Sequence, residues 1–193
     1  MTLEEVLAVL DGESLDDARR KMALNVDLHA EGTRYRGLPP SEWPTLIFNW
    51  DLSEDSQQYA LDGVKAIQFQ QQYPEGLQIG WVNLVEFDTK LCHFSRRAKE
   101  ELWSVGCASK LAKTVAYLSR GLPITPPLVA PIKDKDELVF HGGNHRYAAL
   151  KAIAFDGEFP IYIAPEYFEE VKQIVRVRSN PIVSNDAGQH LVA

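Results

Sequence analysis

Apolar positions in the first part of the chain recur at helical spacing, and polar capping residues precede them. Thr2 and Glu5 have the spacing of a capping box before an apolar run that ends at a glycine. Ser14 and Asp17 repeat this signature before a second amphipathic segment. The pattern predicts two helices and then, from Glu31 to Pro44, a loop rich in glycine, proline and charge. The candidate core positions of the second helix are Ala18, Met22, Leu24 and Val26.

The next part of the chain keeps a helical pattern but carries weaker signals. Residues 46–50 form a short apolar run that fits either a strand or a helix. Residues 53–73 have the spacing of one helix, which the Pro-Glu-Gly sequence at 74–76 would end. The candidate inward residues of this helix are Tyr59, Val64, Ile67 and Phe69. The pattern thus predicts a helical N-terminal part over residues 1–76.

From residue 77 the pattern changes to apolar strands that alternate with helical segments. The predicted strands cover residues 77–87, 128–132, 137–141 and 159–164. The predicted helices cover residues 94–103, 109–118, 144–155 and 165–175. The order β-α-α-β-β-α-β-α predicts an α/β fold of the α+β kind, with a mixed sheet and flanking helices over residues 77–175. The polar tail, residues 176–193, is expected to be loose.

Composition narrows the class of protein. The 193 residues carry a formal net charge of -7, which argues against a dedicated, basic nucleic-acid binder. We find neither the basic start and apolar core of a signal peptide nor an apolar run long enough to span a membrane. Cys92 and Cys107 do not form a metal-binding spacing. A cytoplasmic protein with two free thiols is therefore expected.

The chemically most informative segment is a glycine pair between a predicted strand and a predicted helix. Gly142 and Gly143 allow a ligand to approach the bare backbone, and the following helix start offers free N–H groups and a positive dipole end. Asn144 suits the helix N-cap, His145 titrates near neutral pH, and Arg146 can grip phosphate oxygens. These residues predict a phosphate site. The alternative is a tight turn whose polar residues only cap the helix.

The sequence Gly-Gly-Asn-His-Arg at residues 142–146 resembles the signature of the ParB/sulfiredoxin superfamily, whose members carry Gly-Gly-Cys-His-Arg or related sequences at a strand-to-helix turn. The stretch Gly121-Leu-Pro-Ile-Thr-Pro-Pro-Leu-Val129 and the strand at 159–163 are similar to the flanking elements of that superfamily. The resemblance covers residues 77–175. It implies a nucleotide-binding module, with ATP as the favoured nucleotide.

This chain departs from two branches of that superfamily. Asn144 stands where sulfiredoxins have their nucleophilic cysteine, so sulfinic-acid reduction is not implied. Partition proteins place a helix-turn-helix domain after the module, and the tail at 176–193 has no room for one. The resemblance that remains is to stand-alone members, which include nucleotide hydrolases, nucleases and plasmid-borne proteins of fertility inhibition and oncogenic suppression.

A second group of candidates lies before the signature. Lys110 and Thr114 share one face of a predicted helix, and Lys113 and Tyr117 share a neighbouring face. The resemblance implies that such a helix supplies polar side chains to the phosphates. The alternative is an ordinary solvated face. Glu86 and Asp88 are predicted at a strand end, where Glu86 could bind Mg²⁺ or simply be solvated.

The basic pair Arg96 and Arg97 has two readings as well. It could contact a nucleotide or a nucleic-acid backbone, or it could lie on a surface helix and balance Glu100 and Glu101.

These residues lead to two main hypotheses. In the first, the protein is a metal-dependent nucleoside triphosphate hydrolase, in which His145 and Arg146 are catalytic; the same machinery could cut a phosphodiester and act as a nuclease. In the second, it is a non-catalytic binding or inhibitory protein that contacts a protein partner through residues 1–76. A weaker third hypothesis is a small-molecule kinase, since some superfamily members phosphorylate free serine.

Overall fold

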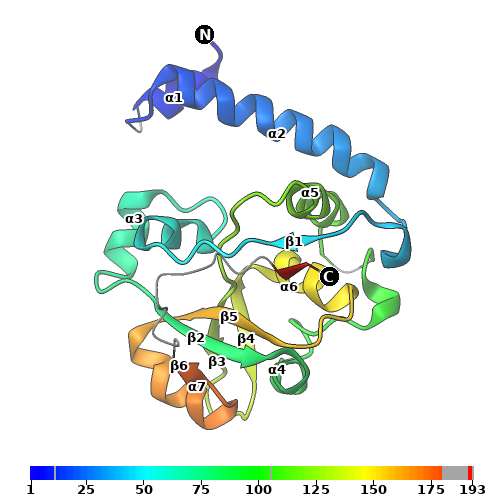
Figure 1. Cartoon of the computed structure of the whole chain (residues 1–193). Helices are drawn as coiled ribbons and strands as arrows, with labels where there is room; N and C mark the ends of the chain where they lie inside the picture. The colour runs from blue at the N-terminus through cyan, green and yellow to red at the C-terminus, as the bar shows by residue number, and fades with distance from the viewer. Residues whose placement is uncertain (11, 105, 180–190, 193) are drawn as a thin grey trace.

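The computed structural model describes residues 1–10, 12–104, 106–179 and 191–192. The fold is of the mixed α/β kind, as predicted, with a five-stranded sheet flanked by helices and a separate two-stranded sheet. Figure 1 shows α1 (Leu3–Leu10) folded back along α2 (Leu15–Tyr35), and α2 lying across α5 (Ala108–Ser119). In this view α5 and α6 (Asn144–Ala152) lie above the five-stranded sheet and α7 (Phe168–Ile174) lies below it.

The larger sheet has the strand order β4-β3-β5-β2-β6. Its strands are β2 (Gln78–Asn83), β3 (Leu128–Pro131), β4 (Leu138–Gly142), β5 (Glu158–Ile163) and β6 (Arg178–Ser179). The β3–β5 pair is parallel and the other pairs are antiparallel. The β3–β4 hairpin ends at the glycine pair and leads directly into α6, so the sheet fixes the position of the candidate phosphate turn.

Both predicted helix starts at the N-terminus are confirmed by their capping contacts. The backbone N–H of Thr2 donates to the Glu5 carboxylate at 2.7 Å, and the Glu5 N–H donates to the Thr2 hydroxyl at 3.2 Å. At the second helix, the Asp17 N–H donates to the Ser14 hydroxyl at 3.1 Å. Of the core positions predicted for this helix, Ala18 is buried, but Val26 is exposed, and Leu28 is buried in its place.

The loop predicted from Glu31 was wrong over its first residues, because α2 continues to Tyr35. Gly32 lies inside the helix at the point where α2 packs on α5. A Cβ at Gly32 would stand 2.8 Å from the carbonyl carbon and oxygen of Ala112, so the glycine is required by the close approach of the two helices. The glycine that suggested a loop is therefore a packing residue.

The single helix predicted over residues 53–73 was also wrong. The segment is divided into a 3-10 helix, η2 (Glu54–Ala60), and the short α3 (Ala66–Gln72). Phe69 is buried, whereas Tyr59 and Ile67 are exposed. The break between the two helices carries side chains to the candidate site described below.

Two boundaries in the middle of the chain differ from the prediction. The strand predicted over 77–87 ends at Asn83, because the Asn83 side-chain oxygen accepts from the N–H groups of Val85 and Glu86 and starts α4 (Leu84–Lys90). The helix predicted over 94–103 is reduced to the 3-10 turn η3 (Lys99–Glu101). The order β-α-α-β-β-α-β-α does occur from residue 77, but its first helix is α4, in a segment that was predicted as strand, and not the helix predicted over 94–103.

The remaining elements begin and end close to their predicted bounds. The prediction is confirmed for α5, β3, β4, α6 and β5; the last helix is α7, preceded by the 3-10 turn η4 (Pro165–Tyr167). The loose tail was wrong for residues 178–179, which form β6, and for β7 (Leu191–Val192). Residues 180–190 and 193 of that predicted tail lie outside the described residues.

Residues from the N-terminal third share the main hydrophobic core. Two strands far apart in the sequence, β1 (Ile47–Phe48) and β7, pair in an antiparallel register. Trp43, Leu46 and Phe48 belong to the same cluster as residues of α5 and of the large sheet. Segments on both sides of residue 76 therefore bury apolar surface together. Within the described ranges, the molecule contains no helix that combines the length and the apolar character of a membrane span.

Candidate functional site

A cavity of about 790 Å³ lies between α5 and the start of α6. One face of α5 lines it through side chains at helical spacing of three and four residues, and the other walls come from the α6 start and from residues 51, 59, 61–64 and 123–125. The structure thus brings together two segments that the sequence analysis singled out separately. The predicted site residues on its wall are Lys110, Thr114, Gly143, His145 and Arg146.

The glycine turn before α6 is set by backbone contacts. Gly143 is the N-cap of α6 and has a φ of 88°, a left-handed conformation that favours glycine. Asn144 is therefore the first helical residue, and its prediction as the N-cap was wrong. A Cβ at Gly142 would stand 2.0 Å from the carbonyl oxygen of Ala60, and one at Gly143 would stand 2.6 Å from the Cα of Pro127. The turn lets α6 start directly at the cavity, where the first N–H groups of the helix have no acceptor within it.

Lys110 is paired with a carboxylate that the sequence analysis did not identify. Its ammonium lies 2.8 Å from Asp62 Oδ2, and both side chains are largely exposed. The Asp62 carboxylate raises the pKa of Lys110, and the Lys110 hydrogen bond lowers the pKa of Asp62. Lys110 is therefore fully charged at neutral pH, and its present partner is exposed enough to be exchanged for another anion.

The other polar side chains on this face of α5 donate hydrogen bonds to protein oxygens. Lys113 donates to the side-chain oxygen of Asn25 on α2. The Thr114 hydroxyl donates to the Lys110 carbonyl at 2.9 Å, and the Tyr117 hydroxyl donates to the Pro123 carbonyl at 2.6 Å. Burial raises the pKa of Tyr117, so its phenol stays protonated. This face presents two ammonium groups and two hydroxyls to the cavity.

His145 places an imidazole on the opposite wall. Its Nε2 is buried and has no hydrogen-bond partner in the part of the chain that the structure describes. Burial lowers the pKa of His145, and the charges of Arg97 and Lys110 lower it further, while Asp62 opposes them. The side chain is therefore neutral at pH 7. Its buried Nε2 is a nitrogen without a hydrogen-bond partner among the described residues.

Arg146 differs from the role that the sequence suggested. Its Nη1 donates to the carbonyls of Thr125 at 2.6 Å and Pro126 at 3.0 Å, and to the Thr125 hydroxyl. Its Nη2 donates to the carbonyls of Tyr59 and Ala60, each at 3.2 Å. Both terminal nitrogens thus bind protein oxygens. The guanidinium therefore joins the end of η2 to residues 125–126, which precede β3. It adds positive charge to the cavity wall but does not present a free fork to a phosphate.

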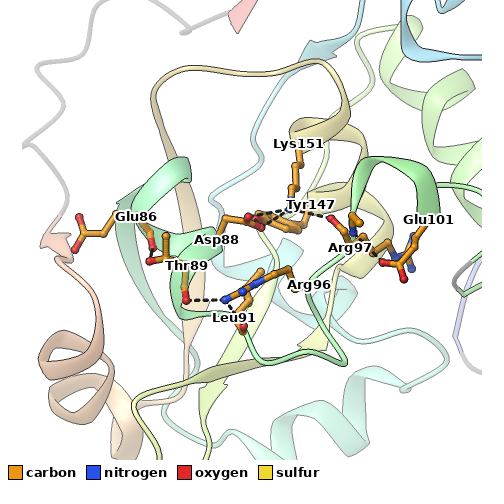
Figure 2. A network of polar contacts seen from close by, with 10 residues as sticks. Glu86, Asp88, Thr89, Leu91, Arg96, Arg97, Glu101, Tyr147 and Lys151 are labelled. Atoms are coloured by element: carbon orange, nitrogen blue, oxygen red, sulfur yellow. Dashed lines mark hydrogen bonds and ion pairs between the residues drawn. The ribbon is translucent and has the colours of Figure 1, made fainter.

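Three of the predicted site residues lie outside this cavity. Gly142 packs on Ala60, and Asn144 lines a different cavity along α6. Glu86 lies on α4, where its carboxylate accepts from the Arg176 N–H at 3.0 Å. Figure 2 shows Glu86 pointing away from Asp88, so the two acids do not form a pair. The described residues contain no group of three or more His, Cys, Asp and Glu side chains placed to hold a metal ion.

Asp88 instead holds a polar network next to α6 (Figure 2). It accepts from the Tyr147 hydroxyl at 2.6 Å and from Lys151 at 2.7 Å and 2.8 Å. Lys151 also donates to the carbonyl of Arg97 at 2.8 Å. Arg96 donates to the carbonyls of Thr89 and Leu91. The network fastens α4 and the segment after it to α6.

Two carboxylates on the cavity wall, Asp51 and Asp62, were not predicted from the sequence. Tyr117 lies on the face of α5 that it shares with Lys113, four residues earlier. Asp51 and Asp62 had no such signal, because Asp51 precedes η2 and Asp62 lies in the break between η2 and α3. No protein-family model, curated protein or solved structure matches the chain.

Proposed function

We propose that the protein binds the phosphate groups of a nucleotide in the cavity between α5 and α6. The observation that carries the proposal is that Lys110, Lys113 and Thr114 face the N-terminus of α6 and His145 across one cavity of about 790 Å³. Cationic side chains on one wall and a helix N-terminus on the other form a favourable environment for an anion. The volume lies within the range of small-molecule and cofactor sites.

A nucleoside triphosphate, with ATP favoured, is the ligand that fits this arrangement best. The resemblance of residues 142–146 to the ParB/sulfiredoxin signature supports the same class of ligand. Asp51 and Asp62 give the wall two carboxylates. Mg²⁺ commonly binds through one or two carboxylates together with the phosphates of its nucleotide, and it would supply charge neutralisation there. A cytoplasmic location, where such nucleotides are available, belongs to the same proposal.

Hydrolysis is the reaction that the neutral His145 favours. Water attacks the γ-phosphorus, the bond from this phosphorus to the β-γ bridging oxygen breaks, and the nucleoside diphosphate leaves while inorganic phosphate forms. The imidazole accepts the proton of the attacking water, because the low pKa of His145 leaves it unprotonated at pH 7. Lys110 stabilises the charge that develops on the phosphate oxygens. Attack on a phosphodiester by the same groups would give a nuclease instead.

Binding is tested by titrating the purified full chain with ATP and Mg²⁺ in a calorimeter. Lys110→Ala should weaken binding roughly tenfold, the size expected for one charge-assisted hydrogen bond. Lys135→Ala is the matched control, because Lys135 pairs with Glu137 on the polar turn between β3 and β4. Equal affinity of wild type and Lys110→Ala would remove the proposal.

Hydrolysis is tested separately by phosphate release with Mg²⁺ and with a chelator. His145→Ala should retain nucleotide binding and lose release, whereas Lys135→Ala should retain both. Binding without release would keep the nucleotide site and reject hydrolysis. Cleavage of a DNA or RNA oligonucleotide that depends on His145 would identify the nuclease.

A second candidate function rests on the outer face of α1. Leu3, Leu7 and Leu10 recur at spacing of four and three residues and are 74%, 48% and 76% exposed. An exposed apolar stripe of this kind is typical of a helix that contacts a protein partner. We propose, as the alternative to catalysis, that residues 1–76 carry such a contact.

The full chain with Leu3, Leu7 and Leu10 replaced by serine tests this alternative. The triple variant should lose a partner that wild type captures and that rebinds as a purified protein, while His145→Ala keeps it. If the triple variant retains every captured partner, the contact does not involve α1.

A further inference from the structure

A second cavity, of about 240 Å³, follows one face of α6. The helix lines it at spacing of three and four residues, whereas the phosphate cavity takes the neighbouring positions Gly143, His145 and Arg146. The two cavities share no lining residue. The α6 residues on the second cavity are Asn144, Tyr147, Ala148, Lys151 and Ala152.

Arg97 gives this cavity a charge without a partner. Its Nη1 is buried, and no described residue accepts a hydrogen bond from it. Burial lowers the pKa of Arg97, and no carboxylate offsets that effect. A buried donor without an acceptor costs free energy, and a charged one costs more than a neutral one. The Arg97 guanidinium therefore lacks an anionic partner among the described residues.

Lys151, the other charged residue on this cavity wall among the described residues, is already satisfied. Lys151 has three N–H groups, and they go to both oxygens of Asp88 and to the Arg97 carbonyl. Asp88 also accepts from the Tyr147 hydroxyl. Figure 2 shows this closed network beside Arg97. The Arg97 guanidinium is thus the charge on this wall that is left for a ligand.

The Arg97 guanidinium lies close to the backbone of Gly106. Lys151 binds the Arg97 carbonyl, and a Cβ at Gly106 would overlap the Arg97 Nη2. Gly106 has a φ of 77°, so a side chain at this position would be strained as well. The unpaired Nη1 favours an anionic ligand group such as a carboxylate, because a hydrogen bond between two charged groups is stronger than one between neutral groups.

The rest of the cavity is mainly apolar. Its apolar lining residues include Leu102, Ala148 and Ala152, and Asn144 adds one amide. A volume of about 240 Å³ excludes a nucleotide and suits a small molecule. We propose that this cavity binds a small organic carboxylate, whose carboxylate pairs with Arg97 and whose apolar part lies against Leu102, Ala148 and Ala152.

Sodium benzoate is the probe, and benzyl alcohol is its uncharged counterpart of similar shape. Titration of the ¹⁵N-labelled full chain should give saturable shifts of the Ala148 and Ala152 amides and of the Arg97 side-chain N–H. Benzyl alcohol should bind at least about tenfold more weakly, since it cannot form the ion pair. Equal binding of the two, or no saturation by benzoate up to about 10 mM, would overturn the proposal.

Variants separate this site from the phosphate cavity. Arg97→Gln should abolish the preference for benzoate over benzyl alcohol. Ala152→Leu fills the cavity without touching the charge and should abolish binding of both, which keeps the test valid where Arg97→Gln fails to fold. Lys110→Ala should bind benzoate as wild type does; a tenfold loss in Lys110→Ala would assign benzoate to the phosphate cavity instead and reject the second site.

Discussion

The Lys110 ammonium and the Asp62 carboxylate face each other at 2.8 Å on the wall of the phosphate cavity. Lys110 belongs to a regular helix face, while Asp62 reaches it from the break between η2 and α3. Asp62 therefore competes with a bound phosphate for the Lys110 ammonium.

Asp62→Asn should therefore tighten the binding of inorganic phosphate. Without the carboxylate, Lys110 is free to pair with the incoming anion. An exposed ion pair contributes up to about 1 kcal/mol, so the gain in affinity should be roughly two- to fivefold. Calorimetric titration with phosphate in the absence of metal measures it. Glu137→Gln, which removes the partner of Lys135 on a distant turn, should leave the affinity unchanged.

The effect of Asp62→Asn on binding affinity should depend on whether the ligand carries Mg²⁺. If Asp62 contributes to Mg²⁺ binding, Asp62→Asn should weaken Mg·ATP binding while it tightens phosphate binding. Weaker binding of phosphate alone would contradict the competition between Asp62 and the anion.

The charges around His145 predict how its titration responds to mutation. Burial, Arg97 and Lys110 lower its pKa, Arg146 adds to the lowering, and Asp62 acts in the other direction. Arg97→Gln and Lys110→Ala should each raise the pKa of His145, and Asp62→Asn should lower it further. Titration of the imidazole C–H signals by NMR measures all three shifts. An unchanged pKa in Arg97→Gln would show that Arg97 does not act on this imidazole.

This titration also links folding stability to pH. In the unfolded chain His145 takes up its proton near its ordinary pKa of 6.5, before the folded protein does. Its contribution to stability is therefore fully present above pH 6.5 and is lost as the pH falls from there to the folded pKa. His145→Gln should flatten this part of the stability curve, as measured by urea unfolding at a series of pH values.

The second half of the fold could be predicted because its signals are local. The β3–β4 hairpin, the glycine turn and α6 follow from strand alternation, two glycines and a helical run, and the Ser14 and Thr2 caps are likewise read within four residues. The elements that failed depend on contacts distant in sequence. Gly32 suggests a loop until Ala112 is placed against it, and the apolar spacing of residues 82–87 fits a strand until Asn83 caps a helix.

In the candidate site too, residues with a local sequence signal were predicted, and those that depend on contacts distant in sequence were not. Lys110, Thr114 and His145 were found because each lies on a regular face or in a recognisable turn, and the structure gathers them. Arg146 was given a phosphate-binding role because its side chain suits one; its acceptors are the carbonyls of residues 59–60 and 125–126, which no spacing reveals. The sequence indicated Arg97 only as one of a basic pair with Arg96; the burial of its Nη1 and the absence of a partner for it among the described residues had no local signal.

Arg146 should consequently matter more for stability than a surface arginine does. Arg146→Ala leaves the carbonyls of Tyr59, Ala60, Thr125 and Pro126 without this donor, and the residues Ala60 and Thr125 are buried. The expected loss in the free energy of unfolding is about 3 kcal/mol, measured by urea denaturation. Arg146→Lys should lose less, because one ammonium can bind some of the same oxygens. A loss below about 1 kcal/mol in Arg146→Ala would contradict this structural role.

Gly32 allows a prediction opposite in sign to the usual rule for helices. Replacing a glycine by alanine inside a helix normally stabilises by about 1 kcal/mol. Here the new Cβ would stand 2.8 Å from the backbone of Ala112 and Lys113, and backbone atoms cannot move aside. Gly32→Ala should therefore push α2 off α5 and lower the free energy of unfolding by about 1–3 kcal/mol.

Ala30→Gly supplies the matched control, because Ala30 is exposed in the same helix. It should cost about 1 kcal/mol through helix propensity alone and leave the α2–α5 contact intact. The contact has its own readout in the hydrogen bond from Lys113 to Asn25, which joins the two helices. Gly32→Ala should perturb the Asn25 side-chain amide signals in an NMR spectrum, and Ala30→Gly should not. If Gly32→Ala stabilises the protein as helix propensity alone predicts, the close approach of α2 to α5 is wrong, and the cavity face of α5 is not held by α2.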